Sequence, residues 1–182
     1  MADEAAPIVN EGKGLPLICI DSSEHSIRAL EWYFLYLHKE GDTVGLAHVH
    51  VLPDMPGYGL FGHRVYEEAH ATKYFKDGEP VATMFNQHQI QESVRESKAI
   101  ADRAKERCQE KGVNAKVLVE TSQDSIGHTI CKIAQENNAS MIVIGQRGLG
   151  TIRRTFLGSV SDYVLHHAQI PVLVVPPLPE EK

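Results

Sequence analysis

The strongest constraint on the fold is a set of short apolar runs that do not alternate with polar residues. Four runs stand out, at residues 17–20, 44–51, 141–144 and 172–175, of which 44–51 is less purely apolar because it contains two histidines. Runs of this kind are typical of strands that are buried on both faces, as in a parallel sheet. A fifth candidate, residues 116–120, carries a charged residue at each end, which indicates an edge strand.

Segments with helical periodicity separate these runs. The predicted helices span residues 23–39, 83–111, 125–137 and 159–168. In the first helix, the expected buried stripe consists of Ile27, Leu30, Phe34 and Leu37, which recur at intervals of three and four. Strict alternation of strand and helix predicts an α/β fold, with an open five-stranded parallel sheet and helices on both faces.

Capping residues support these boundaries. Ser22 or Ser23 is a candidate N-cap for the first helix, and Asp124 is the candidate for the third. Gly41 and Gly112 follow the ends of the first and second helices, where a glycine commonly stops the helix.

The organisation along the chain predicts one domain with extensions. The 182 residues suffice for one domain, which we place at residues 15–176, with a flexible extension at 1–14 and a flexible tail at 177–182. Residues 52–80 break the alternation with several prolines, glycines and aromatic residues, so we expect a long loop or insertion. That loop is either a lid or partner surface or a tolerated insertion, and residues 65–75 can form a short helix within it.

Composition narrows the classes of function. The net charge of −6 argues against a nucleic-acid partner, because nucleic-acid binding normally needs a basic surface. No apolar stretch is long enough for a membrane helix, and the N-terminus lacks the pattern of a signal peptide. The three cysteines are far apart in the sequence, which fits a reduced compartment, and we expect a cytoplasmic protein.

The glycine-rich stretch after the fourth strand is the most informative part of the sequence. Gly145 and Gly148 flank Arg147, and Gly158-Ser159 opens the last helix. Backbone N–H groups at a helix start carry partial positive charge and suit phosphate oxygens. This loop lies at the carboxyl edge of the sheet, where open parallel sheets bind ligands.

An alternative explanation needs no ligand. Ser159 and Asp162 match a capping box, and the two earlier glycines can simply form a turn. Two other phosphate-binding patterns are absent, since the chain has neither GxxxxGK[ST] nor a complete dinucleotide fingerprint.

The spacing Gly145-x2-Gly148-x9-Gly158-Ser159 resembles the G-x2-G-x9-G-[S/T] signature of ATP-binding universal stress proteins. The flanking strands and the stretch Ile18-Cys-Ile-Asp21-Ser-Ser-Glu24 are similar as well, and the resemblance covers about residues 15–176.

The resemblance implies that ATP, alone or with Mg²⁺, binds at this edge of the sheet. It assigns the adenine to Asp21, the Val49 backbone and Ile144, with Cys19 in the wall of the pocket. It assigns the ribose and the phosphates to Gly145, Arg147, Gly148, Gly158, Ser159, Val160 and Ser161. It further implies a homodimer formed through the last strand and an unidentified protein partner.

Other arrangements of polar residues give weaker signals. His48 and His50 lie two apart on a strand and so share a face, but the sequence shows no further ligands for a metal. No catalytic motif such as GxSxG or HExxH occurs, and we predict no catalytic residue. We therefore expect an ATP-binding stress-response module. The alternatives are a slow ATP-hydrolysing enzyme that uses the same pocket and a dimeric interaction protein whose pocket is vestigial.

Overall fold

The structure is a computed structural model that describes residues 14–51, 75–76, 79–122, 125–146 and 157–177. The strands are β1 (Leu15–Cys19), β2 (Thr43–His50), β3 (Phe75–Lys76), β4 (Glu79–Pro80), β5 (Asn114–Thr121), β6 (Ala139–Gly145) and β7 (Val172–Val175). The helices are α1 (Glu24–Tyr36), α3 (Val81–Glu110), α4 (Ile126–Glu136) and α5 (Ser159–His167). None of these helices is long and apolar enough to cross a membrane.

The main sheet has the order β5-β2-β1-β6-β7, and every neighbouring pair is parallel. The apolar strand β1 is central, with Leu17 paired to Gly45 on one side and to Ile142 on the other. The strand with charged ends, β5, lies at one edge, as its composition predicts. The predicted fold class is therefore confirmed.

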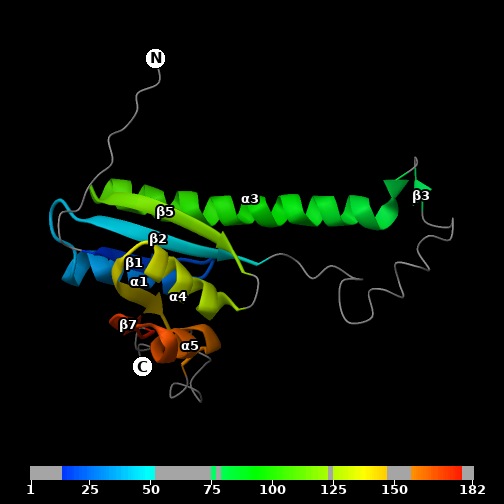
Figure 1. The fold of residues 1–182 in the computed structure, drawn as a ribbon. Helices are drawn as coiled ribbons and strands as arrows, with labels where there is room; N and C mark the ends of the chain where they lie inside the picture. Colours follow the sequence, from blue (N-terminus) through cyan, green and yellow to red (C-terminus); the bar gives the residue numbers. More distant parts are fainter. Residues whose placement is uncertain (1–13, 52–74, 77–78, 123–124, 147–156, 178–182) are drawn as a thin grey trace, which may run out of the picture.

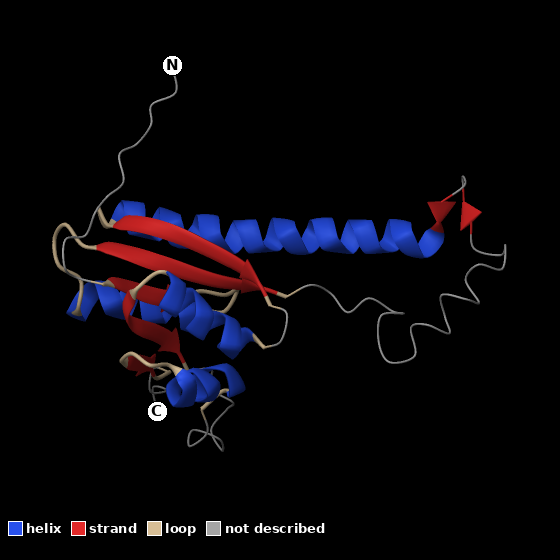
Figure 2. Ribbon diagram, in the orientation of Figure 1, coloured by secondary structure: helices blue, strands red, loops and turns tan. Residues whose placement is uncertain are grey.

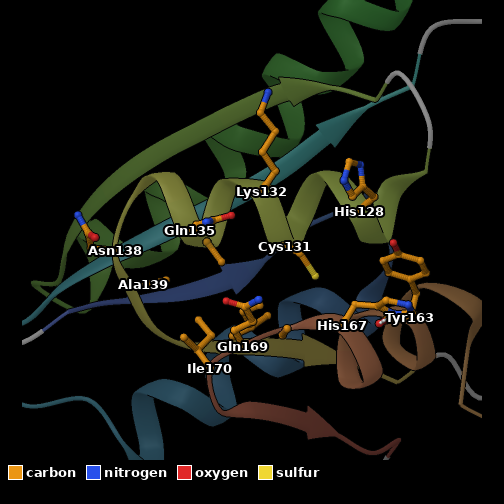
Figure 3. A pocket seen from close by; sticks show the side chains of 13 residues that line it. His128, Cys131, Lys132, Gln135, Asn138, Ala139, Tyr163, His167, Gln169 and Ile170 are labelled. Carbon is orange, nitrogen blue, oxygen red and sulfur yellow. Dashed lines mark hydrogen bonds between the residues drawn. The ribbon is translucent and has the colours of Figure 1, made fainter.

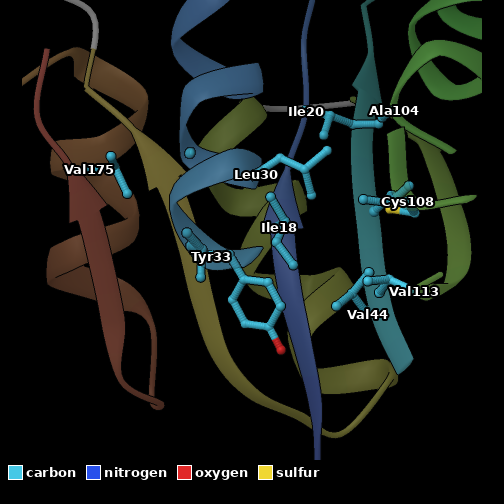
Figure 4. Packing of buried hydrophobic residues seen from close by; sticks show 12 residues of the cluster. Ile18, Ile20, Leu30, Tyr33, Val44, Ala104, Cys108, Val113 and Val175 are labelled. Carbon is cyan, nitrogen blue, oxygen red and sulfur yellow. The ribbon is translucent and has the colours of Figure 1, made fainter. Parts of the chain in front are cut away.

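Helices cover both faces of the sheet (Figures 1 and 2). On one face, α1 and α3 pack over a core that includes Ile18, Leu30 and Tyr33 (Figure 4). On the other face, α4 and α5 pack over a core that includes Leu17 and Ile142. Because neighbouring residues of a strand point to opposite faces, Leu17 and Ile18 supply one side chain to each core. Both are completely buried, and each contributes about 1.5–3 kcal/mol relative to an exposed side chain.

The buried face of α1 differs from the predicted one. Its buried residues are Ser26, Ala29, Leu30 and Tyr33. Leu30 is the one member of the predicted stripe that is fully buried, and the helix ends at Tyr36 rather than Lys39. Tyr33 is part of the core over the sheet, and Phe34 is partly buried and packs against the margin of that core. Leu37 is 37% exposed and serves as the C-cap.

The N-caps of two helices differ from the residues suggested by the sequence, although α5 starts at Ser159 as predicted. The N-cap of α4 is Ser125, whose hydroxyl accepts a hydrogen bond from the His128 N–H at 3.2 Å. The predicted cap, Asp124, lies outside the described residues. The N-cap of α5 is Gly158, so Ser159 is already helical and the capping box predicted for it is wrong.

Part of the predicted 52–80 loop has regular structure. Phe75–Lys76 and Glu79–Pro80 form a small antiparallel pair that leads directly into α3, two residues before the predicted start of that helix. Residues 52–74 lie outside the described residues, and so does nearly all of the short helix predicted at 65–75. The 30-residue α3 extends well beyond the sheet (Figure 1). Its end agrees with prediction, since Gly112 follows it with a φ of +68°.

Candidate functional site

A cavity of about 350 Å³ lies at the carboxyl edge of the sheet. The ends of β1, β2 and β6 form one side of it, and the first turn of α5 forms the other. The chain winds from β1 toward β2 and β5 in one direction and toward β6 and β7 in the other. The cavity therefore occupies the switch point where open parallel sheets bind their ligands.

The structure brings together nine of the predicted site residues in the lining of this cavity. They are Cys19, Asp21, Val49, Ile144, Gly145, Gly158, Ser159, Val160 and Ser161. The remaining two, Arg147 and Gly148, lie outside the described residues.

Sequence reasoning missed several further residues of the lining. These are Ile20, Ser23, Ser26, Ala47, His48, Ile126 and Ile130. Two signals could have found some of them: Ala47 shares a strand face with Val49, and Ile126 and Ile130 lie one helical turn apart. These apolar residues, together with Ile144, form a slot next to the sheet.

The turn after β1 is held by hydrogen bonds within the chain. The N–H and the hydroxyl of Ser23 both donate to Oδ1 of Asp21, at 2.9 and 2.5 Å. The Ser26 hydroxyl accepts from the Asp21 N–H at 3.1 Å and lies 3.0 Å from the carbonyl oxygens of Asp21 and Ser23. Because local bonds hold both its backbone and its Oδ1, Asp21 occupies a fixed position at the cavity wall.

The N-cap of α5 is Gly158, which has no side chain, and it makes no side-chain capping bond within the described part of the chain. The first amides of a helix lack intrahelical partners and carry partial positive charge, which favours an anion nearby. A Cβ atom added to Gly158 would meet Ser161 Oγ at 3.6 Å, an ordinary contact, and the φ of Gly158 is −65°. The fold therefore accepts a side chain at position 158, and glycine leaves this space open beside the amides.

Gly145 has a steric role that the sequence did not indicate. A Cβ atom there would lie 2.3 Å from the carbonyl oxygen and 2.7 Å from the carbonyl carbon of His25. Because Gly145 has no side chain, the start of α1 can pack close to the end of β6. The group that lies against Gly145 is therefore the backbone of His25. Gly145 also lines the cavity, and the approach of a ligand there stays a prediction.

His48 and His50 connect β2 to α3. His48 Nδ1 lies 3.0 Å from the carbonyl oxygen of Ile20, so Nδ1 carries the hydrogen, and in the neutral ring Nε2 accepts from the Ser97 hydroxyl at 3.1 Å. His50 Nε2 lies 2.6 Å from the Ser93 hydroxyl. These bonds account for two buried imidazoles. Among the described residues, no three metal-ligating side chains lie together.

The thiol of Cys19 lines the cavity in its uncharged form. Burial, with smaller effects from Cys131 and Asp21, raises the pKa of Cys19 from 9.0 to about 12. Since the thiolate is the nucleophilic form, Cys19 is inert at neutral pH. The site thus combines an apolar slot, a fixed carboxylate turn and a helix start with a glycine N-cap, which suits a ligand with a flat apolar part and an anionic part.

Comparison with known proteins agrees with this architecture. The family model described as the universal stress protein family matches residues 17–176. The chain belongs to this family. The resemblance noted in the sequence is thereby confirmed at the level of the family.

Curated members of the family show the same relationship. Universal stress protein YxiE of Bacillus subtilis is 37% identical over 84 residues, which cover 46% of this chain and 55% of YxiE. The chain spans about half the length of the first curated universal stress proteins that it matches.

Solved universal stress proteins share the fold at low identity. One from Arabidopsis thaliana, solved with AMP bound, is 17% identical with a TM-score of 0.57, over 92% of this chain and 94% of that one. Another, from Archaeoglobus fulgidus in complex with dAMP, is 22% identical with a TM-score of 0.54, over 89% and 97% of the two chains.

Proposed function

We propose that this universal stress protein binds an adenine nucleotide, ATP, in the switch-point cavity. The observation that carries the proposal is the first turn of α5, which starts at a glycine N-cap without a capping side chain and lies across the cavity from an apolar slot. A volume of about 350 Å³ lies within the range of small-molecule sites. The AMP and dAMP in the two distant structural relatives support an adenine nucleotide as the ligand class.

The two halves of the cavity suggest how the nucleotide would lie. The adenine would occupy the slot beside Ile144, with Asp21 and the Val49 backbone at its edges. The phosphates would lie against the amides and hydroxyls of Gly158, Ser159, Val160 and Ser161. Gly145, Arg147 and Gly148 would contact the ribose and the phosphates, and Mg²⁺ would accompany ATP there.

The wider role follows from the binding proposal. We infer a cytoplasmic regulatory module, with residues 15–176 as a single domain, that responds to nucleotide and acts on a protein partner. We also infer a homodimer formed through β7, because β7 is an edge strand of four apolar residues whose outer side pairs with no described strand.

Calorimetry with nucleotide-free protein tests the binding proposal. Titration with Mg-ATP is expected to show one saturable site, and Gly158→Val is expected to weaken it. A valine side chain would stand between the phosphates and the α5 amides. Because each lost charge-assisted hydrogen bond costs about 1.5–3 kcal/mol, the affinity should fall about 100-fold.

A matched control separates binding from stability. Gly41 has a φ of +86° and open space around its Cβ position, and it lies outside the lining of the cavity. Gly41→Val should therefore lower the stability while leaving the ATP affinity unchanged. Unchanged affinity in Gly158→Val, or an equal loss in both variants, would refute the assigned phosphate position.

A further inference from the structure

Arg28 connects helix α1 to the end of strand β6. Its Nη2 donates to the carbonyl oxygen of Gln146 at 3.2 Å, across 118 positions of the sequence. Its Nη1 lies 3.0 Å from Nδ1 of His25, and because a guanidinium only donates, Nδ1 of His25 is the acceptor. One side chain thus joins the start of α1 to the carboxyl edge of the sheet.

Two further contacts hold the same end of β6. The Gln146 N–H donates to the Val175 carbonyl oxygen on β7 at 2.8 Å. Gly145, the residue before it, packs against the carbonyl group of His25 and lines the switch-point cavity. Gln146 is also the last described residue before the glycine-rich stretch. Its N–H and its carbonyl group are therefore held on two sides, by β7 and by Arg28.

The charge of Arg28 is poorly compensated where it lies. Both of its hydrogen-bond acceptors are uncharged groups, and its Nε is buried without a partner among the described residues. Burial lowers the pKa of Arg28, although a guanidinium stays charged at neutral pH. Because removing a charge from water without an opposite charge costs free energy, stability alone does not explain an arginine at this position.

Arg28 lines neither of the two cavities that border α4 and α5. It is not among the described lining residues of the switch-point cavity. The larger cavity, of about 630 Å³, lies between α4 and α5 on the face of the sheet opposite α1 (Figure 3), and Arg28 is not part of its described lining either. Any effect of Arg28 on a ligand must therefore pass through the residues that it holds.

We propose that Arg28 is a positioning residue for the nucleotide site, because it holds the Gln146 carbonyl and so fixes the end of β6 at the cavity. The inference rests on the proposed function, which places the ribose and the phosphates beside Gly145 and the glycine-rich stretch. Without the guanidinium, the end of β6 keeps its bond to β7 but loses its bond to α1. The geometry at Gly145 then becomes less fixed, and ATP binds more weakly.

Amide hydrogen exchange in the nucleotide-free full chain, followed residue by residue by NMR, tests whether Arg28 holds Gln146. Arg28→Met keeps an unbranched stem and removes the guanidinium. The Gln146 amide should exchange about tenfold faster in this variant, because a hydrogen bond from a charged donor is lost at the same residue. The Ile20 amide, which donates to the Ala47 carbonyl oxygen at 2.8 Å, should exchange at the wild-type rate and so exclude a global loss of stability.

Calorimetry with Mg-ATP tests the consequence for binding. Arg28→Met should weaken ATP binding about tenfold relative to the wild type. Arg107→Met is the matched control, since Arg107 is another arginine that contacts α1, through Glu31 at 3.4 Å, but it does not contact Gln146 or line the cavity. Its affinity for ATP should equal that of the wild type.

Four results would overturn the proposal. They are wild-type exchange of the Gln146 amide in Arg28→Met, equally faster exchange at Gln146 and Ile20, faster exchange at Gln146 with unchanged ATP affinity, and an equal loss of affinity in Arg107→Met. Wild-type protein that binds no ATP would instead refute the proposed function. The exchange rate of Gln146 would then still decide whether Arg28 holds this end of β6.

Discussion

Replacing Gly145 with alanine tests the role that the structure assigns to this glycine. The added Cβ would start 2.3 Å from the carbonyl oxygen of His25, whereas ordinary contacts begin near 3.4 Å. The beginning of α1 must therefore move by about 1 Å away from β6, against close packing. The two nearest atoms, the carbonyl oxygen and carbon of His25, both belong to the backbone, so no side-chain rotation can relieve the overlap.

The expected cost follows from these distances. Overpacking typically costs about 1–3 kcal/mol, and more when the backbone has to shift. Alanine regains about 0.5–1 kcal/mol over glycine in a strand. We expect a net loss of about 2 kcal/mol in the free energy of unfolding, which corresponds to a fall of about 4–8 °C in Tm for a chain of this length.

Urea denaturation measures this loss. The chain has a single tryptophan, Trp32, and it lies on α1, so its fluorescence reports on the helix that must move. Gly158→Ala is the control, because its Cβ meets only an ordinary contact, and its cost should stay below about 1 kcal/mol. If Gly145→Ala unfolds at the wild-type midpoint with an unchanged m-value, the steric explanation of Gly145 is wrong.

Three further predictions follow from buried contacts. Ser97→Ala should cost about 1–3 kcal/mol in urea denaturation, because Nε2 of buried His48 loses its hydroxyl partner; Ser97→Thr, which keeps a hydroxyl, should cost less. Gly127→Ala should cost about 1–3 kcal/mol by the same assay, since its Cβ would overlap Tyr163, and full stability would show that α4 and α5 can separate freely. Because the folded state keeps the Cys19 thiol protonated to a pKa of about 12, against 9.0 ordinarily, unfolding releases a proton above pH 9. The free energy of unfolding should therefore fall as pH rises from 9 toward 12, and Cys19→Ala should flatten that decline.

The fold could be predicted because each long strand is marked by its own run of apolar residues in the sequence. An apolar run such as Leu17–Ile20 has few alternatives to a buried strand, and charged ends at 116–120 correctly indicated an edge. The pair β3–β4 was missed, because strands of two residues carry no periodicity.

Details of the helices depended on tertiary contacts. Helical spacing alone could not distinguish a stripe through Phe34 from one through Tyr33, since both satisfy a period of 3.6. In the structure, the residue that is fully buried in the core over the sheet is Tyr33. At α5, the sequence offered both Ser159, as part of a capping box, and Gly158 as the possible cap. In the structure Gly158 is the N-cap, so the helix starts one residue earlier than the capping box requires.

The candidate site was predictable to the extent that it lies at strand ends. The order of strands and helices brings the carboxyl ends of β1, β2 and β6 to one edge, and the family resemblance placed Asp21, Val49 and Ile144 there. The bond between His48 and Ser97 could not be found, because it joins residues 49 apart and depends on where α3 crosses β2. The steric role of Gly145 could not be predicted either, because it depends on where α1 passes the end of β6.

The central position of β1 has a consequence for the order of folding during synthesis. Its first partner, β2, leaves the ribosome soon after it, but β6 follows only about ninety residues after β2 ends. At about 5–20 residues per second, roughly 5–20 s pass between the synthesis of β2 and that of β6, the second neighbour of β1. Over that interval the nascent chain exposes an unpaired, aggregation-prone edge at what becomes the middle of the molecule.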